Sequence, residues 1–373
     1  MIDIAGGLAE YAAQHLKTAG QQRATSVNDI IDNPDYLAYR FDFGQETVEF
    51  LPTSRAAMRR AHSLSRQALD SGHEGVSVPL GQLAPLLADG GRAPETNPPR
   101  FIFHTAFCSS TFLSRCLDTD GVCFGLREPQ LLLDAANAKR LQWRSPSTGM
   151  GHEELARLAL ILLRKHAAPG EKLVIKPINT VNNIVTELMQ MTGRSKALML
   201  HTGARNFLLS TLKKGEPAKH TVRSMFDLVR CDFPQLERLR MSDTIHLTDL
   251  KVIMTLWRLQ LEQASSVLQY FAPRDRMASV YGERLVVDPA AALHAANRFL
   301  ELGIPAERLD AIAGEHGKDD AKVAGARFSA DSRGQAYRRI EDFYGDELDK
   351  GLEWMTRNNP GTQLVPELPG PLG

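Results

Sequence analysis

Cysteine is scarce in this 373-residue sequence, and its four cysteines do not have the spacing of metal ligands. They are Cys108, Cys116, Cys123 and Cys231. The first three fall in apolar sequence, which favours reduced, buried thiols over a disulfide framework. The cysteine pattern therefore predicts a cytoplasmic protein without a metal site.

Long hydrophobic runs and an excess of one charge are also absent. No apolar run approaches the roughly 18 residues that a membrane-spanning helix needs, and Asp3 and Glu10 interrupt the first apolar turns, so no signal peptide is expected. Lysine plus arginine and aspartate plus glutamate each number 44, for a formal net charge of zero. The composition predicts a globular protein that has neither nucleic acid nor a membrane as its partner.

The sequence also lacks the phosphate-binding motif Gly-x4-Gly-Lys-Ser/Thr of ordinary ATPases and kinases. No obvious magnesium-binding acid follows a predicted strand. These two absences disfavour a phosphotransferase. Magnesium-dependent hydrolysis of ATP or GTP by the protein would support this hypothesis again.

What the sequence does have is a strand, a hydroxyl-rich loop and a helix between residues 100 and 117. Residues 101–103 (Phe-Ile-Phe) form a short apolar run typical of a buried parallel strand. Small and polar residues follow at 104–111, and then a helical pattern begins. A strand that breaks in this way aims several backbone N–H groups at one point, where the helix dipole also favours negative charge. This stretch therefore predicts an anion site for phosphate or sulfate.

Strands and helices alternate along the central part of the chain. The predicted strands are 101–104, 122–126, 173–176, 197–201 and 277–281, and the predicted helices are 111–117, 130–141, 152–165, 181–191, 205–213 and 249–271. Continuous apolar strands that alternate with helices are typical of a parallel sheet covered on both faces. The sequence therefore predicts an α/β domain over residues 96–357.

The two ends of the chain differ from this domain. Residues 36–51 alternate in hydrophobicity and predict a hairpin around Gly44 and Gln45. Residues 88–99 are rich in glycine, proline and polar residues and predict a linker. We expect residues 1–95 to form a small N-terminal α+β cap and residues 358–373 to form an irregular tail.

Several chemically capable residues fall at the ends of predicted strands. His104, Glu128 and Lys176 end or follow three of them, and residues 201–205 follow a fourth. Ligands of open α/β sheets bind at the carboxyl ends of the strands. This coincidence predicts a single site at that edge of the sheet.

Five short segments resemble, in order, motifs of the sulfotransferases, with the pattern closest to bacterial and tyrosylprotein enzymes. Residues 105–112 (Thr-Ala-Phe-Cys-Ser-Ser-Thr-Phe) are similar to the 5′-phosphosulfate loop, Thr-Pro-Lys/Arg-Ser-Gly-Thr-Thr-Leu. Residues 127–129 (Arg-Glu-Pro) resemble a Glu-Pro or Glu-Glu segment, and residues 176–177 (Lys-Pro) a Lys-Asp-Pro segment. Residues 202–210 resemble Arg-Asp-x-Arg-x4-Ser, which holds the 3′-phosphate, and residues 283–302 resemble Glu-Asp-Leu-Val-x-Asp-Pro followed by Phe-Leu-Gly-Leu.

The resemblance implies a P-loop-NTPase-like three-layer sandwich that takes 3′-phosphoadenosine 5′-phosphosulfate as co-substrate, without a metal. The implied reaction moves a sulfuryl group to a hydroxyl or amine of a small-molecule or peptide acceptor. The implied nucleotide-binding residues are Thr105, Cys108, Ser109, Ser110 and Thr111 at the 5′-phosphosulfate, Arg205 and Ser210 at the 3′-phosphate, and Lys318 and Arg333 in a segment that folds back over the nucleotide. Glu128 would act as the general base, and Lys176 would neutralise charge on the transferring group.

Two positions depart from the family pattern. The loop lysine or arginine is Phe107 here, and the first arginine of the 3′-phosphate motif is Thr202. Removing a preorganised charge of this kind typically costs about 10²–10³ in rate. The candidate replacements are Lys176, Arg127 and His104 at the loop and His201 near the 3′-phosphate.

Each assignment also has a purely structural alternative. Glu128 suits the start of a helix, and Lys176 could be an ordinary strand-end charge. Arg205 and Ser210 could be surface residues, and Cys108 more simply fills the family's serine position than acts as a reactive thiol. Two functions therefore stay open, a sulfotransferase and a non-catalytic nucleotide- or anion-binding protein of the same fold. The sequence identifies neither the acceptor nor the oligomeric state, for which a homodimer is one option.

Overall fold

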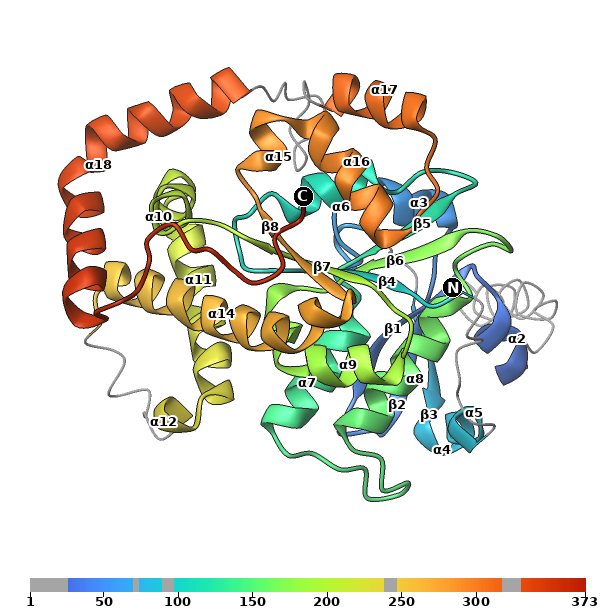
Figure 1. Cartoon of the computed structure of the whole chain (residues 1–373). Coiled ribbons are helices and arrows are strands. Elements are labelled where there is room, and N and C mark those ends of the chain that lie inside the picture. Colours follow the sequence, from blue (N-terminus) through green and yellow to red (C-terminus); the bar gives the residue numbers. More distant parts are fainter. Residues whose placement is uncertain (1–25, 70–73, 89–96, 238–246, 317–329) are drawn as a thin grey trace, which may run out of the picture.

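The computed structural model describes residues 26–69, 74–88, 97–237, 247–316 and 330–373. Within them the chain forms a five-stranded parallel sheet, and a three-stranded antiparallel sheet precedes it in the sequence (Figure 1). Residues 1–25, and residues 89–96 of the predicted linker, lie outside the described residues. No helix of the described part is long and apolar enough to cross a bilayer.

The parallel sheet has the strand order β5-β6-β4-β7-β8, so its first strand in the sequence lies at its centre. The strands are β4 (Arg100–His104), β5 (Cys123–Arg127), β6 (Lys172–Lys176), β7 (Ala197–His201) and β8 (Met277–Tyr281). Every residue of β4, β5 and β7 is buried, as continuous apolar strands require. The predicted α/β class with a central parallel sheet is confirmed.

Helices cover both faces of the sheet and make three layers. The helices are α6 (Ser110–Cys116), α7 (Gln130–Arg140), α8 (His152–Arg164), α9 (Val185–Met191), α10 (Ala204–Lys213), α11 (Glu216–Val229), α12 (Pro234–Glu237), α14 (Asp249–Phe271), α15 (Arg284–Val287), α16 (Pro289–Leu300), α17 (Ala306–His316) and α18 (Ala330–Asn358), with short 3-10 turns η1 (Asn179–Ile184), η2 (Arg230–Asp232) and η3 (Ala272–Arg274). One face of the sheet, which includes Phe101 and Phe103, packs against α7, α8, α9 and the end of α14. The other face, which includes Ile102 and Leu198, packs against α6, α16 and α17.

A second helical cluster lies beside this sandwich. α10, α11, α14 and α18 pack together around Trp257 and Phe207, both fully buried. Of these helices the sequence predicted only α10 and α14. α11 lies in a part of the sequence for which no helix is predicted, and α18 follows the last of the five sulfotransferase-like segments. This cluster matters for the site because α10 starts directly after β7.

The N-terminal part is a sheet of β1 (Tyr36–Asp42), β2 (Thr47–Pro52) and β3 (Val76–Pro79), with α2 (Val27–Asp32), α3 (Arg55–Arg60), α4 (Leu80–Leu83) and α5 (Pro85–Ala88) around it. β1 and β2 form the predicted hairpin. Buried side chains of this sheet belong to the same hydrophobic cluster as α7 and α8. The N-terminal sheet is thus packed directly onto the α/β domain, while the exact boundary at residue 95 stays a prediction.

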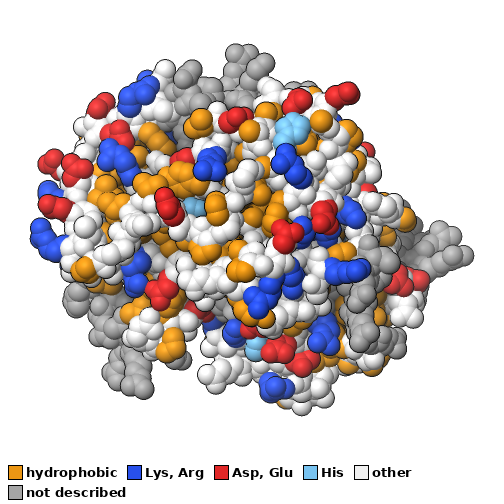
Figure 2. Space-filling view, in the orientation of Figure 1, with side chains coloured by type: hydrophobic (Ala, Val, Ile, Leu, Met, Phe, Trp, Pro, Cys, Tyr) orange, Lys and Arg blue, Asp and Glu red, His pale blue; other side chains and the backbone are white. Residues whose placement is uncertain are grey.

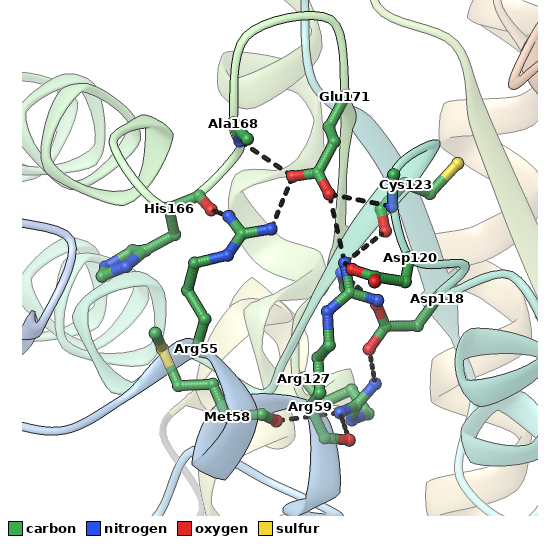
Figure 3. A network of polar contacts seen from close by, with 12 residues as sticks. Arg55, Met58, Arg59, Asp118, Asp120, Cys123, Arg127, His166, Ala168 and Glu171 are labelled. Atoms are coloured by element: carbon green, nitrogen blue, oxygen red, sulfur yellow. Dashed lines mark hydrogen bonds and ion pairs between the residues drawn. The ribbon is translucent and has the colours of Figure 1, made fainter.

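A buried polar network joins α3 to the end of β5 (Figure 3). The guanidinium of Arg127 is 1% exposed and bonds the Asp118 carboxylate at 2.9 Å. It also donates to the backbone oxygens of Met58, Arg59 and Ala61 at the end of α3. The Arg127 guanidinium is therefore bound to these structural partners. The prediction that it could replace the missing charge at the loop is wrong.

The C-terminal tail runs along the free edge of β8 (Figure 1). Ser279 donates its N–H to the oxygen of Gly370 at 2.7 Å, and its oxygen accepts from the N–H of Leu372 at 2.8 Å. Apart from one isolated bridge, residues 360–373 contain no helix or strand. The tail satisfies backbone groups that an open sheet edge would leave unpaired.

We expect Asp134→Asn to change how stability depends on pH. The buried Asp134 carboxylate accepts the N–H of Phe41 at 2.8 Å, and burial raises the pKa of this carboxyl to about 6. Because the folded protein holds this proton more tightly than the unfolded chain, the contribution of Asp134 to stability falls as the pH rises from about 4 to about 6. Two pKa units correspond to roughly 3 kcal/mol. Urea unfolding at pH 4, 5, 6 and 7 should show the wild type losing up to that much stability relative to the variant.

The matched control is Asp35→Asn, because Asp35 is exposed. Its difference from the wild type should stay constant over the same pH range. A constant difference for Asp134→Asn as well would contradict the prediction.

Candidate active site

The loop of residues 105–109, between β4 and α6, lies over the carboxyl end of the central strand. Phe107 and Ser109 have left-handed backbone conformations, with φ of 60° and 63°. Non-glycine residues rarely adopt this conformation, which costs about 1–3 kcal/mol. α6 begins next, at Ser110, and no side chain caps its first turn. Since the first N–H groups of a helix have no partner within it, the loop and helix start can offer donors to an anion.

Neighbouring elements hold this loop in place. The N–H of Thr105 donates to the oxygen of Leu200 in β7 at 2.8 Å. The N–H of Ala106 donates to Oε1 of Gln260 in α14, also at 2.8 Å. The first two loop residues are therefore fixed by the sheet and by the long helix before any ligand binds.

Gly282, directly after β8, supports the middle of the loop. A Cβ atom at this position would lie 2.4 Å from the oxygen of Cys108, so only glycine fits without a shift of the backbone. Cys108 is 2% exposed, and its Sγ donates to the oxygen of Thr105 at 2.9 Å. Burial raises the pKa of the Cys108 thiol to about 12. Cys108 therefore fills space in the loop, and its environment disfavours the reactive thiolate.

Glu128 and Lys176 meet at the ends of β5 and β6. Nζ of Lys176 lies 2.7 Å from Oε1 of Glu128, and the N–H of Glu128 donates to the oxygen of Lys176 at 2.6 Å. Glu128 has a left-handed backbone with φ of 58°, a conformation that turns it out of the line of the strand. The Lys176 side chain is 1% exposed and that of Glu128 is 29% exposed. The two predicted catalytic residues thus form one pair, with the carboxylate on the solvent side.

His104 lies between this pair and the loop. Its Nδ1 lies 2.8 Å from the oxygen of Thr105, and its Nε2 lies 3.1 Å from the oxygen of Pro177. Burial, with Lys176 as a smaller cause, lowers the pKa of His104 to about 3. The ring is neutral, so the hypothesis that His104 replaces the missing loop cation is wrong.

A carboxylate occupies the region where the resemblance implies the 3′-phosphate. Oε1 of Glu283 accepts hydrogen bonds from Oγ1 of Thr202 and Nδ2 of Asn206, and its Oε2 is buried without a hydrogen-bond partner among the described residues. Burial and Glu283 together raise the pKa of Tyr281 to about 12. Burial also lowers the pKa of His201 to about 4, so His201 is neutral and adds no positive charge.

Arg205 and Ser210 both face α18. Nη2 of Arg205 lies 3.0 Å from Oε1 of Glu341, and Oγ of Ser210 lies 2.7 Å from Oη of Tyr337. The two implied 3′-phosphate ligands therefore share one side of α10, and in this state α18 supplies their partners. A phosphate at this side would compete with Glu341 for Arg205.

The remaining predicted residues lie as follows. Ser109, Ser110 and Thr111 lie at the start of α6, as expected for the anion loop. Lys318 lies outside the described residues. Arg333 is part of α18, where the backbone alone is described at this position.

The sequence analysis missed two residues that contact the loop. Lys214 follows α10, and its Nζ lies 4.5 Å from the centre of the Phe107 ring. No sequence signal marks it, since a lysine at a helix end is ordinary. Gln260 had a signal, because it is a fully buried amide inside the apolar stripe of α14. A polar residue on a core face needs a partner, and the loop provides one.

A cavity of about 880 Å³ adjoins the Glu283 side of the site. It lies between β8, α16 and residues 365–373, and His201 and Tyr281 line it. Valine, alanine, leucine and proline make up most of its lining. Figure 2 shows that hydrophobic side chains lie among charged ones on the face of the molecule that it draws. The β8 edge of the site is therefore mainly apolar, whereas the β5 edge carries the Lys176–Glu128 pair. Among the described residues, no group of three or more His, Cys, Asp or Glu side chains is placed to hold a metal ion.

No protein-family model matches the sequence, and no curated protein matches it significantly. Several solved structures are similar at low identity. The sulfotransferase domain from the curacin biosynthetic pathway is 14% identical, with a TM-score of 0.41 over 67% of this chain and 99% of that one. The sulfotransferase domain from the Synechococcus PCC 7002 olefin synthase is 14% identical, with a TM-score of 0.38 over 63% and 83%. The sulfotransferase STF9 from Mycobacterium avium is 13% identical, with a TM-score of 0.37 over 72% and 79%.

We expect Gly282→Ala to displace the loop. The new Cβ would overlap the Cys108 carbonyl, so the loop backbone must move, at a cost of about 1–3 kcal/mol in unfolding free energy. Thermal unfolding should show this loss. Gly193→Ala is the control, because nothing lies within 4 Å of its Cβ position, and it should change stability by less than about 0.5 kcal/mol. Equal stability of the two variants would show that Gly282 does not support the loop.

Proposed function

We propose that this protein transfers a sulfuryl group from 3′-phosphoadenosine 5′-phosphosulfate to an acceptor hydroxyl or amine. The observation that carries the proposal is the arrangement at three neighbouring strand ends. The anion loop follows β4, the buried Lys176 ends β6, and Glu128 follows β5 and pairs with Lys176 at 2.7 Å. A donor-rich loop beside a fixed cation and a partly exposed carboxylate suits transfer of an anionic group.

The chemistry assigns one task to each part. N–H groups of the loop and of the first turn of α6, with the Ser110 and Thr111 hydroxyls, would hold the 5′-phosphosulfate. Glu128 would take the proton from the acceptor as the new bond from acceptor oxygen or nitrogen to sulfur forms. The bond from sulfur to the bridging phosphate oxygen breaks, and adenosine 3′,5′-bisphosphate leaves. Lys176 would neutralise the charge that develops on that oxygen.

The residues at the proposed 3′-phosphate position are less suited to bind a phosphate than those at the loop. Glu283 accepts from Thr202 and Asn206, and Arg205 is paired with Glu341. Both carboxylates oppose a phosphate. These contacts favour a second candidate function, a nucleotide- or anion-binding protein of the same fold that performs no transfer.

We expect Glu128→Gln to abolish turnover while nucleotide binding survives. Loss of a general base typically costs 10²–10⁴ in rate, and the amide keeps the shape of the side chain. First, thermal unfolding with adenosine 3′,5′-bisphosphate at about 100 times its dissociation constant should stabilise the wild type and the variant alike by roughly 2.7 kcal/mol. Turnover is then measured with 3′-phosphoadenosine 5′-phosphosulfate and a panel of alcohols, phenols, amines and tyrosine peptides.

Removing one charge of the buried pair also risks instability, because the other charge is left unpaired. The double variant Glu128→Gln with Lys176→Met removes both charges and serves as the stability control. Binding by the wild type without turnover on any acceptor would favour the second candidate function. Turnover unchanged in Glu128→Gln would remove Glu128 from the mechanism.

We expect Glu283→Gln to strengthen binding of adenosine 3′,5′-bisphosphate, because the variant removes a negative charge beside the proposed 3′-phosphate site. A hydrogen bond to a charged group typically contributes about 1.5–3 kcal/mol. A change of this size corresponds to an affinity about 10-fold higher or more. Isothermal titration with the bisphosphate and with adenosine 5′-phosphate separates the effect of the 3′-phosphate. An equal rise for both nucleotides, or no rise, would place the 3′-phosphate elsewhere.

A further inference from the structure

The residues at the strand ends do not give the anion loop a net positive charge. Lys176 shares its charge with Glu128 at 2.7 Å. His104 is neutral because burial lowers its pKa to about 3. On the other side of the loop, Glu283 adds a carboxylate that raises the pKa of Cys108 further. An anion held here needs positive charge from another element.

Two consecutive lysines stand at the end of α10, Lys213 as its last residue and Lys214 directly after it. Nζ of Lys214 lies 4.5 Å from the centre of the Phe107 ring, within the range of a cation–π contact. Nζ of Lys213 lies 5.9 Å from the centre of the Tyr337 ring in α18. Lys214 therefore contacts the loop, whereas Lys213 contacts α18.

The Phe107 ring is held firmly enough to position a cation. Its ring meets Phe207 of α10 edge-on, with the ring centres 5.2 Å apart. Its backbone keeps a left-handed φ of 60°, which is unfavourable for a bulky residue and persists only where the surroundings hold it. Position 107 thus has an aromatic ring in place of a charge, and Lys214 lies against that ring.

We propose that Lys214 supplies the positive charge of the anion loop, with Phe107 as the platform that positions it. The inference rests on the proposed function, since it concerns the same anion site. Lys214 would contact the phosphate or sulfate oxygens of the bound nucleotide from the end of α10, whereas Lys176 lies at the end of β6. The sulfotransferase pattern has its cation within the loop, whereas here the cation would reach the loop from the end of α10.

The test compares Lys214→Met with Lys213→Met, which removes the neighbouring charge from the same helix end. Isothermal titration with adenosine 3′,5′-bisphosphate, and separately with inorganic pyrophosphate, is run at 50 and 200 mM NaCl. Lys214→Met should lose about 10-fold or more in affinity, and the remaining binding should depend less on salt. Lys213→Met should bind within about 2-fold of the wild type, and thermal unfolding should show both variants folded.

A rescue variant separates charge from structure. Phe107→Lys in the Lys214→Met background puts a lysine in the loop itself and should restore affinity to within a few-fold of the wild type. Affinity of Lys214→Met equal to that of Lys213→Met, with a wild type that binds, would overturn the role of Lys214 and leave the proposed function standing. A wild type that binds neither ligand would overturn both proposals together.

Discussion

The buried guanidinium of Arg127 fixes the end of β5 and with it the geometry of the site. It bonds the Asp118 carboxylate and three backbone oxygens at the end of α3, so a charged group inside the fold is almost completely satisfied. Breaking a buried pair of this kind typically costs about 3–5 kcal/mol. Glu128 follows immediately, in a left-handed conformation, and meets Lys176. The end of α3 and Asp118 thus stabilise the strand end that presents the candidate base.

The two sides of the site differ in their electrostatic character. Toward β5 and β6 lies a compensated charge pair with its carboxylate partly exposed. Toward β7 and β8 lie a half-buried carboxylate, Glu283, a neutral His201 and a mainly apolar cavity. The anion loop lies between these sides, on the central strand. On the proposed function, group transfer would take place on the β5 side, and the β8 side would contact an apolar part of the ligand.

The fold could be predicted from the sequence because each strand of the parallel sheet is a continuous apolar run with a helix after it. Glu128 and Lys176 could be placed for the same reason, since carboxyl ends of parallel strands share one edge. The contacts of Glu283, Arg205 and Lys214 could not be predicted. They depend on α18, on the turn after β8 and on the direction of side chains at a helix end, none of which hydrophobic periodicity encodes. The left-handed backbone of Phe107 could not be predicted either, because bulky residues rarely adopt a positive φ.

The departures from the sulfotransferase pattern at positions 107 and 202 have connected structural consequences. At position 107 an aromatic ring contacts Lys214, which follows α10 and which we propose as the source of the positive charge. At position 202 a hydroxyl donates to Glu283, so a carboxylate is held where the pattern has an arginine. On this proposal the first change preserves the attraction for an anion at the loop, and the second weakens it at the start of α10. A ligand with its main negative charge at the loop therefore fits these residues better than one with equal charge at both ends.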